Sequence, residues 1–106
     1  MKARPHGRLP ALTVGLLLVG LSSPSMAQDA AAGRALAEQW CAACHAVAPG
    51  EGGSDQVPSF ERIAKERERS EEWLRTWLSV PHQAMPNFSL SDQEITDLVT
   101  YFQSLR

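Results

Sequence analysis

The stretch Cys41-Ala42-Ala43-Cys44-His45 decides how the rest of this chain must fold. It places two thiols three positions apart, with an imidazole directly after the second thiol. Two thiols at this spacing can each form a thioether with one vinyl-bearing porphyrin, and the adjacent imidazole can then bind the porphyrin iron from one face. The stretch therefore predicts one covalently attached haem, held by Cys41 and Cys44, with His45 as an iron ligand.

Two other kinds of site also use paired cysteines. A structural zinc site needs four ligands, but the chain has two cysteines, and beyond its first segment the other imidazole is that of the distant His82. A dithiol redox site is typical of a motif that opens a helix after a strand, and no strand-like alternation precedes Cys41. Haem attachment is therefore the better supported prediction.

The first 27 residues have the features of a secretory signal peptide. A basic start is followed by a short apolar run and by small residues before a cleavage position (Lys2, Arg4 and Arg8; 11–21; Ser25 and Ala27). We expect cleavage after Ala27, which leaves one domain over 28–106 in the periplasm. An uncleaved membrane anchor is the alternative, but the apolar run is about half of the roughly 20 residues that span a bilayer.

Composition narrows the classes of partner. The predicted mature domain keeps all 12 acidic residues of the chain but loses three of its 10 basic ones, so its formal net charge is 7 minus 12, or −5. Such a domain is poorly suited to binding nucleic acid or anionic membranes. A domain of this size also struggles to build a sufficient apolar core unaided. We therefore expect haem to complete the core and the haem-free chain to be largely unfolded.

Capping residues and apolar spacing predict a helix that delivers the haem motif at its end. Asp29 can cap a helix over 30–40. Gly33 inside it costs about 1 kcal/mol relative to alanine, which indicates close approach by another backbone or an aromatic ring. Residues 46–57 are interrupted by proline and glycine and are predicted to be a loop.

Three further elements are predicted after this loop. Pro58 precedes a short element from 59 to about 67, and Ser70 begins a helix that ends before Pro81. The second of these carries an apolar stripe that should cover one face of the haem (Trp73, Leu74, Trp77, Leu78). A capping box begins the last helix, which runs to the chain end (Ser91 and Glu94). The charges between 61 and 72 alternate in sign and predict a solvated surface.

Two residues are candidates for roles around the iron. The carbonyl at or beside Pro58 can accept a hydrogen bond from the second ring nitrogen of His45, although Pro58 could equally serve only to start a helix. Met85 lies in a loop with a proline on each side and is the one methionine beyond the first segment. It is predicted to be the sixth iron ligand, in preference to His82, which is expected to be a surface residue.

These landmarks together resemble the small bacterial class I cytochromes c, which carry a single haem. The resemblance covers the chain from Gly33 to Tyr101 and includes the haem motif, Pro58 and Met85 followed by proline. It implies an all-α cytochrome c fold of three to four helices and loops around one haem c, with the N- and C-terminal helices crossing at Gly33 and Tyr101. It also implies ligation by His45 and Met85. One departure is Val57, where the family usually has glycine.

An iron with both axial positions filled does not readily bind substrate, so the predicted role is single-electron transfer between redox protein donors and acceptors rather than enzymatic catalysis. The alternative is a dedicated cytochrome c subunit of an exported dehydrogenase or oxidase, for which an exposed Trp40 would suit a permanent interface. Gas sensing or peroxidase chemistry would require an open iron position. The sequence predicts no membrane span in the mature form and leaves the oligomeric state open.

Overall fold

The computed structural model describes residues 2–4, 7, 10, 15, 20–21 and 28–106. Most of the predicted signal peptide, 1–27, lies outside these residues and stays a prediction. The elements in chain order are α1 (Ala30–Leu36), a π-helical segment η1 (Ala37–Cys41), α2 (Phe60–Lys65), α3 (Glu71–Ser79) and α4 (Asp92–Ser104). The predicted all-α class is confirmed, because the described part of the chain contains helices and no named strand. None of these helices has the length and apolar character that a membrane crossing requires.

The first helix differs from its prediction in its final turn. The Asp29 side chain accepts a hydrogen bond from Ala32 N at 3.0 Å, which caps α1 as expected. The predicted helix over 30–40 then widens into η1, where Ala42 N donates to Ala37 O at 3.0 Å. Each residue of a π-turn advances through a smaller angle than in an α-helix. Trp40 therefore leaves the buried face of α1 and is 46% exposed.

The terminal helices cross at Gly33, as expected. A side chain there would overlap the Asp97 carbonyl oxygen and would place its Cβ 2.9 Å from the Cβ of Tyr101. The same tyrosine is buried and donates its hydroxyl to Val47 O at 2.5 Å. Tyr101 thus joins α4 both to α1 and to the loop that follows the haem motif.

Helix α4 is the element against which the other α-helices pack. Its capping box is confirmed: Ser91 N donates to Glu94 Oε2 at 2.7 Å, and Glu94 N donates to Ser91 Oγ at 3.2 Å. It contacts α1, α2 and α3. Its apolar side chains, with that of the C-cap residue Leu105, form much of the buried core (Ile95, Leu98, Val99, Tyr101, Phe102). One result is a stack between Phe102 and Phe60 of α2, with ring centroids 4.4 Å apart.

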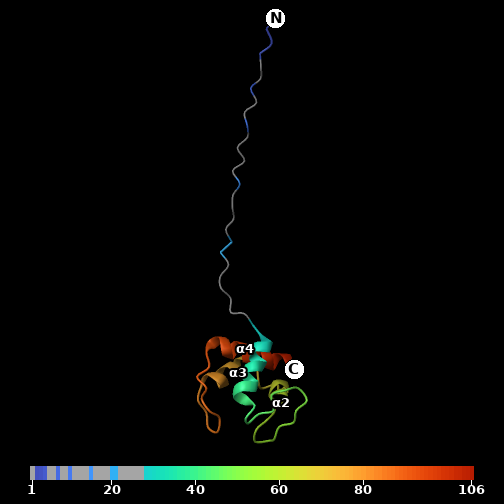
Figure 1. Cartoon of the computed structure of the whole chain (residues 1–106), viewed down its shortest axis with the longest axis vertical. Helices are drawn as coiled ribbons and strands as arrows, with labels where there is room; N and C mark the ends of the chain where they lie inside the picture. The colour runs from blue at the N-terminus through green and yellow to red at the C-terminus, as the bar shows by residue number, and fades with distance from the viewer. Residues whose placement is uncertain (1, 5–6, 8–9, 11–14, 16–19, 22–27) are drawn as a thin grey trace.

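Helices α2 and α3 begin at serine caps, Ser59 and Ser70. Helix α2 ends at Lys65, two residues before its expected end. Most of the charged segment 61–72 is solvated as predicted, with ion pairs such as Lys65–Glu61 four residues apart, but Arg69 is half-buried. Figure 1 shows the loop before α2 and the loop after α3 extending to the same end of the helical body. These two loops lie where the candidate site is found.

Candidate haem-binding site

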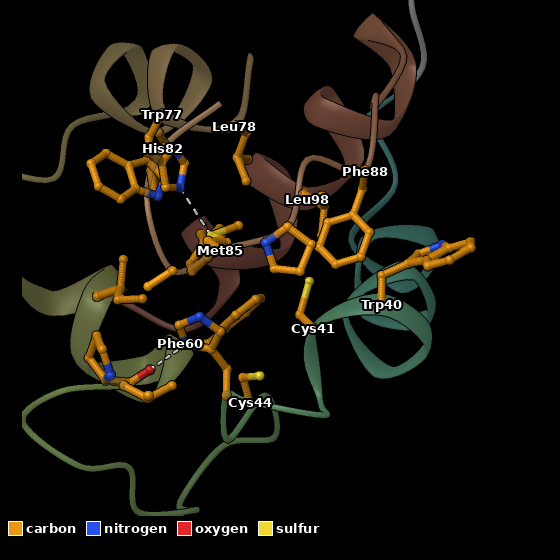
Figure 2. Close-up of a pocket in the computed structure, with 18 of the residues that line it drawn as sticks. Trp40, Cys41, Cys44, Phe60, Trp77, Leu78, His82, Met85, Phe88 and Leu98 are labelled. Carbon is orange, nitrogen blue, oxygen red and sulfur yellow. Dashed lines mark hydrogen bonds between the residues drawn. The ribbon is translucent and has the colours of Figure 1, made fainter. Parts of the chain in front are cut away.

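One cavity of about 590 Å³ lies between the helices and the two loops. Its lining comes from η1, α2, α3 and α4 and is mainly apolar and aromatic. A volume of this order is typical of pockets that enclose most of a small organic ligand. Figure 2 shows Cys41 and Cys44 on one side of the cavity, and Trp77 and His82 on the other. Both cysteines, His45, His82 and Met85 line this single space.

The two cysteines are free thiols: Cys41 is the last residue of η1, and Cys44 lies in the turn that follows. Cys41 is half-buried and Cys44 is exposed. They are held in a tight turn, because Cys44 N and His45 N both donate to Cys41 O, at 3.1 and 2.9 Å. Burial raises the pKa of the Cys41 thiol, so its protonated form is favoured. The turn lets both sulfurs and the imidazole face one cavity.

The His45 ring is oriented by the loop that precedes α2. Its Nδ1 lies 2.7 Å from Pro58 O. A carbonyl oxygen only accepts hydrogen bonds, so Nδ1 must carry the proton. In the neutral ring this leaves Nε2 with a bare lone pair, the form in which imidazole binds a metal. The expected Pro58 bond is confirmed even though Val57 replaces the usual glycine.

Gly53 is a supporting residue that the sequence did not single out. A Cβ at Gly53 would lie 2.8 Å from Val57 O and 2.9 Å from the carbonyl carbon of Pro58, and would overlap Ser59 N. The backbone of Gly53 therefore packs directly behind the carbonyl that holds His45. Proline and glycine in this loop predicted a turn, but contact with Pro58 depends on how the loop closes.

Helix α3 forms one wall of the cavity. Its predicted stripe is confirmed as lining (Trp73, Leu74, Trp77, Leu78). Trp73 and Trp77 stack with ring centroids 5.0 Å apart. Arg69 also lines the cavity, with its guanidinium carbon 4.2 Å from the centre of the Trp73 ring. The sequence placed Arg69 within a solvated charged segment, because charge alternation does not show which cation turns inward.

Met85 reaches the same cavity from the loop after α3, as expected. The loop turns back on itself, so that His82 and Met85 form an isolated antiparallel bridge. Ala84, between them, has φ 66°. A left-handed conformation at a residue other than glycine costs about 1 kcal/mol or more. The tight turn therefore holds Met85 in place at some cost in stability.

The expectation that His82 is a surface residue is wrong. His82 is half-buried and lines the cavity. Its ring centroid lies 3.8 Å from that of Trp77, and its Nε2 lies 3.1 Å from Met85 Sδ. The proline-bounded loop predicted the position of the sulfur, but the inward turn of His82 comes from packing against α3.

The donors in the cavity fit haem c better than a bare metal ion. Among the described residues, no three histidine, cysteine or acidic side chains are arranged to hold a metal ion. A structural zinc site needs four such ligands. Two thiols, an oriented imidazole and a thioether around a large apolar cavity instead match the attachment and ligation of an iron porphyrin.

Comparisons with known proteins agree with this chemistry. Residues 28–102 match the family model described as cytochrome C oxidase, cbb3-type, subunit III. The chain is also 41% identical over 102 residues to cytochrome c-552 of Bradyrhizobium diazoefficiens, a match that covers 95% of this chain and 98% of that protein. No solved structure matches the chain. The chain therefore belongs to the cytochrome c family, as a small class I cytochrome c with covalent haem c that serves electron transfer.

Proposed function

We propose that this protein is a periplasmic single-electron carrier with a His/Met-ligated haem. Cys41 and Cys44 attach the cofactor, and His45 and Met85 ligate its iron. One observation carries the proposal: these four side chains come from two distant segments of the chain, 41–45 and the loop after α3, and line one cavity. The His45 ring is also fixed by the Pro58 carbonyl at 2.7 Å.

The bound haem supplies an iron that gives and accepts one electron. The protein's own residues determine how that iron is used. His45 and Met85 would both bind the iron, which leaves no position for a substrate. A thioether is a soft neutral donor that favours Fe(II) and raises the potential relative to a second imidazole. The apolar lining, with Leu74 and Leu98 buried, excludes water and keeps the surroundings the same in both oxidation states.

Export is supported by the sequence of residues 1–27, with its basic start, apolar run and Ser25-Met26-Ala27. We propose that cleavage follows Ala27 and that 28–106 is the mature domain. N-terminal sequencing of the protein purified from the periplasm tests this, since a mature chain that begins at Met1 would contradict cleavage.

The ligand set is tested by spectroscopy of protein made together with a haem maturation system. We expect a pyridine haemochrome assay to report one haem with both vinyl groups saturated. The oxidised protein should show a sulfur-to-iron absorption band that Met85→Ala removes while the haem stays attached. Purified protein that is colourless, or whose sulfur band survives Met85→Ala, would overturn the proposal.

A dedicated subunit of a larger redox enzyme is the second candidate. Two observations favour it: the matching family model bears the description of an oxidase subunit, and Trp40, which lines the cavity, is still 46% exposed. A large exposed aromatic side chain is typical of a lasting interface. Gel filtration of the native periplasmic extract separates the two functions, because a permanent subunit elutes with a larger enzyme and a carrier elutes alone.

A further inference from the structure

His82 presents the same arrangement of ring nitrogens as His45. Its Nδ1 lies 3.0 Å from Val80 O. Because a carbonyl oxygen accepts but never donates, Nδ1 carries the proton. In the neutral ring, Nε2 therefore has a bare lone pair. A ring nitrogen bound to a backbone carbonyl, with the other nitrogen free, is the usual state of a metal-binding histidine.

The second ring nitrogen of His82, Nε2, lies next to the Met85 sulfur. Nε2 is 3.1 Å from Met85 Sδ, and both residues line the cavity. A thioether sulfur has no proton to donate, so the neutral imidazole gains no strong hydrogen bond from this contact. The imidazole nitrogen and the thioether sulfur are therefore two electron-pair donors side by side in the wall of the cavity. Figure 2 shows this contact, with Trp77 beside the His82 ring.

The surroundings hold the imidazole in this position. The Trp77 ring packs on the His82 ring with centroids 3.8 Å apart. The bridge between His82 and Met85 closes the turn that carries both donors. Exchanging one donor for the other therefore requires adjustment of this turn and no unfolding of a helix. The two ligands favour different oxidation states of the iron. Relative to a thioether, an imidazole lowers the reduction potential and so favours Fe(III).

From these contacts we propose that His82 is a second ligand for the iron position served by Met85. When the thioether is removed or withdrawn, Nε2 of His82 takes its place, and His45 and His82 together give a bis-imidazole site. One coordinate bond from sulfur is lost and one from nitrogen is gained, with no change in oxidation state and no proton released from Nε2. The proposal rests on the proposed function, in which His45 and Met85 are the resting ligands.

The test compares spin states by electron paramagnetic resonance and visible spectroscopy of oxidised, haem-loaded protein. Met85→Ala should remain six-coordinate and low-spin, with the signature of two imidazoles and a lower midpoint potential than the wild type. Met85→Ala with His82→Ala should be high-spin, and added imidazole should restore the low-spin signal. Met85→Ala with Gln83→Ala is the matched control on the same turn and should stay low-spin.

Two outcomes would overturn the proposal. Met85→Ala could be as high-spin as the double variant that lacks His82, or that double variant could stay low-spin through another ligand. Met85→Leu keeps the side-chain volume and answers the same question if the alanine variant fails to fold. A wild-type protein without the sulfur band would instead contradict the resting ligand set, so the two failures are distinguishable.

Discussion

At the scale of single residues, the orientation of His45 depends on one backbone carbonyl and on what lies behind it. The Pro58 carbonyl accepts from His45 Nδ1 at 2.7 Å. Gly53 packs against the same peptide, and its missing side chain leaves the space that the 53–59 backbone needs. A hydrogen bond of this kind raises the basicity of a ligating imidazole and fixes its plane.

Gly53→Ala should therefore change the redox centre as well as the loop. The added Cβ displaces the Pro58 carbonyl, which weakens its bond to His45 and lowers the electron donation of the imidazole. We expect a higher midpoint potential and a loss of about 1–3 kcal/mol in the free energy of unfolding. Redox titration and urea unfolding of the haem-loaded protein measure the two effects.

Gly52→Ala is the matched control, because no atom lies within 4 Å of a Cβ at that position. It should leave both the midpoint potential and the stability unchanged. Equal potentials in the two variants would contradict a positioning role for Gly53, even if Gly53→Ala were the less stable protein.

Glu61 connects the same loop to α2. It accepts from Lys65 Nζ at 2.6 Å and from Gly50 N at 2.8 Å. The Lys65 side-chain hydrogen bond, and then the Gly50 N–H, lower the pKa of the Glu61 carboxyl from its usual value. A lowered pKa means that the stabilisation is present above the pKa of the unfolded chain and is lost as the pH falls through the folded value.

The stability difference between the wild type and Glu61→Gln should therefore shrink in acid. The difference is measured as the urea unfolding midpoints of both proteins, from neutral pH to below the ordinary glutamate pKa. Glu68→Gln, at an exposed position of the same charged segment, provides the comparison for the loss of one surface charge. A difference that stays constant across the range would show that the charge of Glu61 contributes nothing.

At the scale of elements, the crossing of α1 and α4 decides whether a mutation at Gly33 raises or lowers the free energy of unfolding. Helix propensity alone predicts that Gly33→Ala stabilises α1 by about 1 kcal/mol. The structure predicts the opposite, because a Cβ there would overlap the Asp97 carbonyl oxygen. We expect a net loss of about 1–3 kcal/mol, typical of overpacking.

Thermal unfolding of haem-loaded Gly33→Ala measures this effect. Ala35→Gly, at an exposed position of the same helix, measures the difference in helix propensity between alanine and glycine alone. It should lower the free energy of unfolding by about 1 kcal/mol. A Gly33→Ala protein more stable than the wild type would show that α1 and α4 do not cross as closely as described.

At the scale of the whole molecule, α1, α2 and α3 pack against α4, and a cavity remains between the helices and the two loops. All four α-helices and both loops border or support a space of about 590 Å³. A ligand that binds only the folded state stabilises it. A domain this small buries little apolar surface of its own and is marginally stable without such a ligand. The folded state and the cofactor are therefore coupled.

Cys41→Ala with Cys44→Ala, which prevents covalent attachment, should leave most of the domain unfolded. Far-ultraviolet circular dichroism should show loss of most helical signal, and the cooperative thermal transition of the haem-loaded protein should disappear. A haem-free chain that keeps its full helical signal and melts cooperatively would contradict this coupling.

Local patterns in the sequence determined the haem motif, the capping residues of α1, α3 and α4, the crossing glycine and the apolar stripe of α3. Each of these depends on residues within a few positions of one another, where helix geometry and hydrogen-bonding rules apply directly. They were sufficient to predict the all-α fold, and they placed Met85 in a loop directed at the site.

Only the tertiary structure decided the packing of Gly53 behind Pro58 and the inward turn of His82. These features arise where segments distant in the sequence meet: loop against loop, and a ring of one loop against Trp77 of α3. No local pattern encodes such contacts, because they depend on how the two loops close around a shared cavity. From the sequence, His82 was the less favoured candidate ligand and was expected at the surface, and only the packing of the loop against α3 places its ring in the cavity beside Met85.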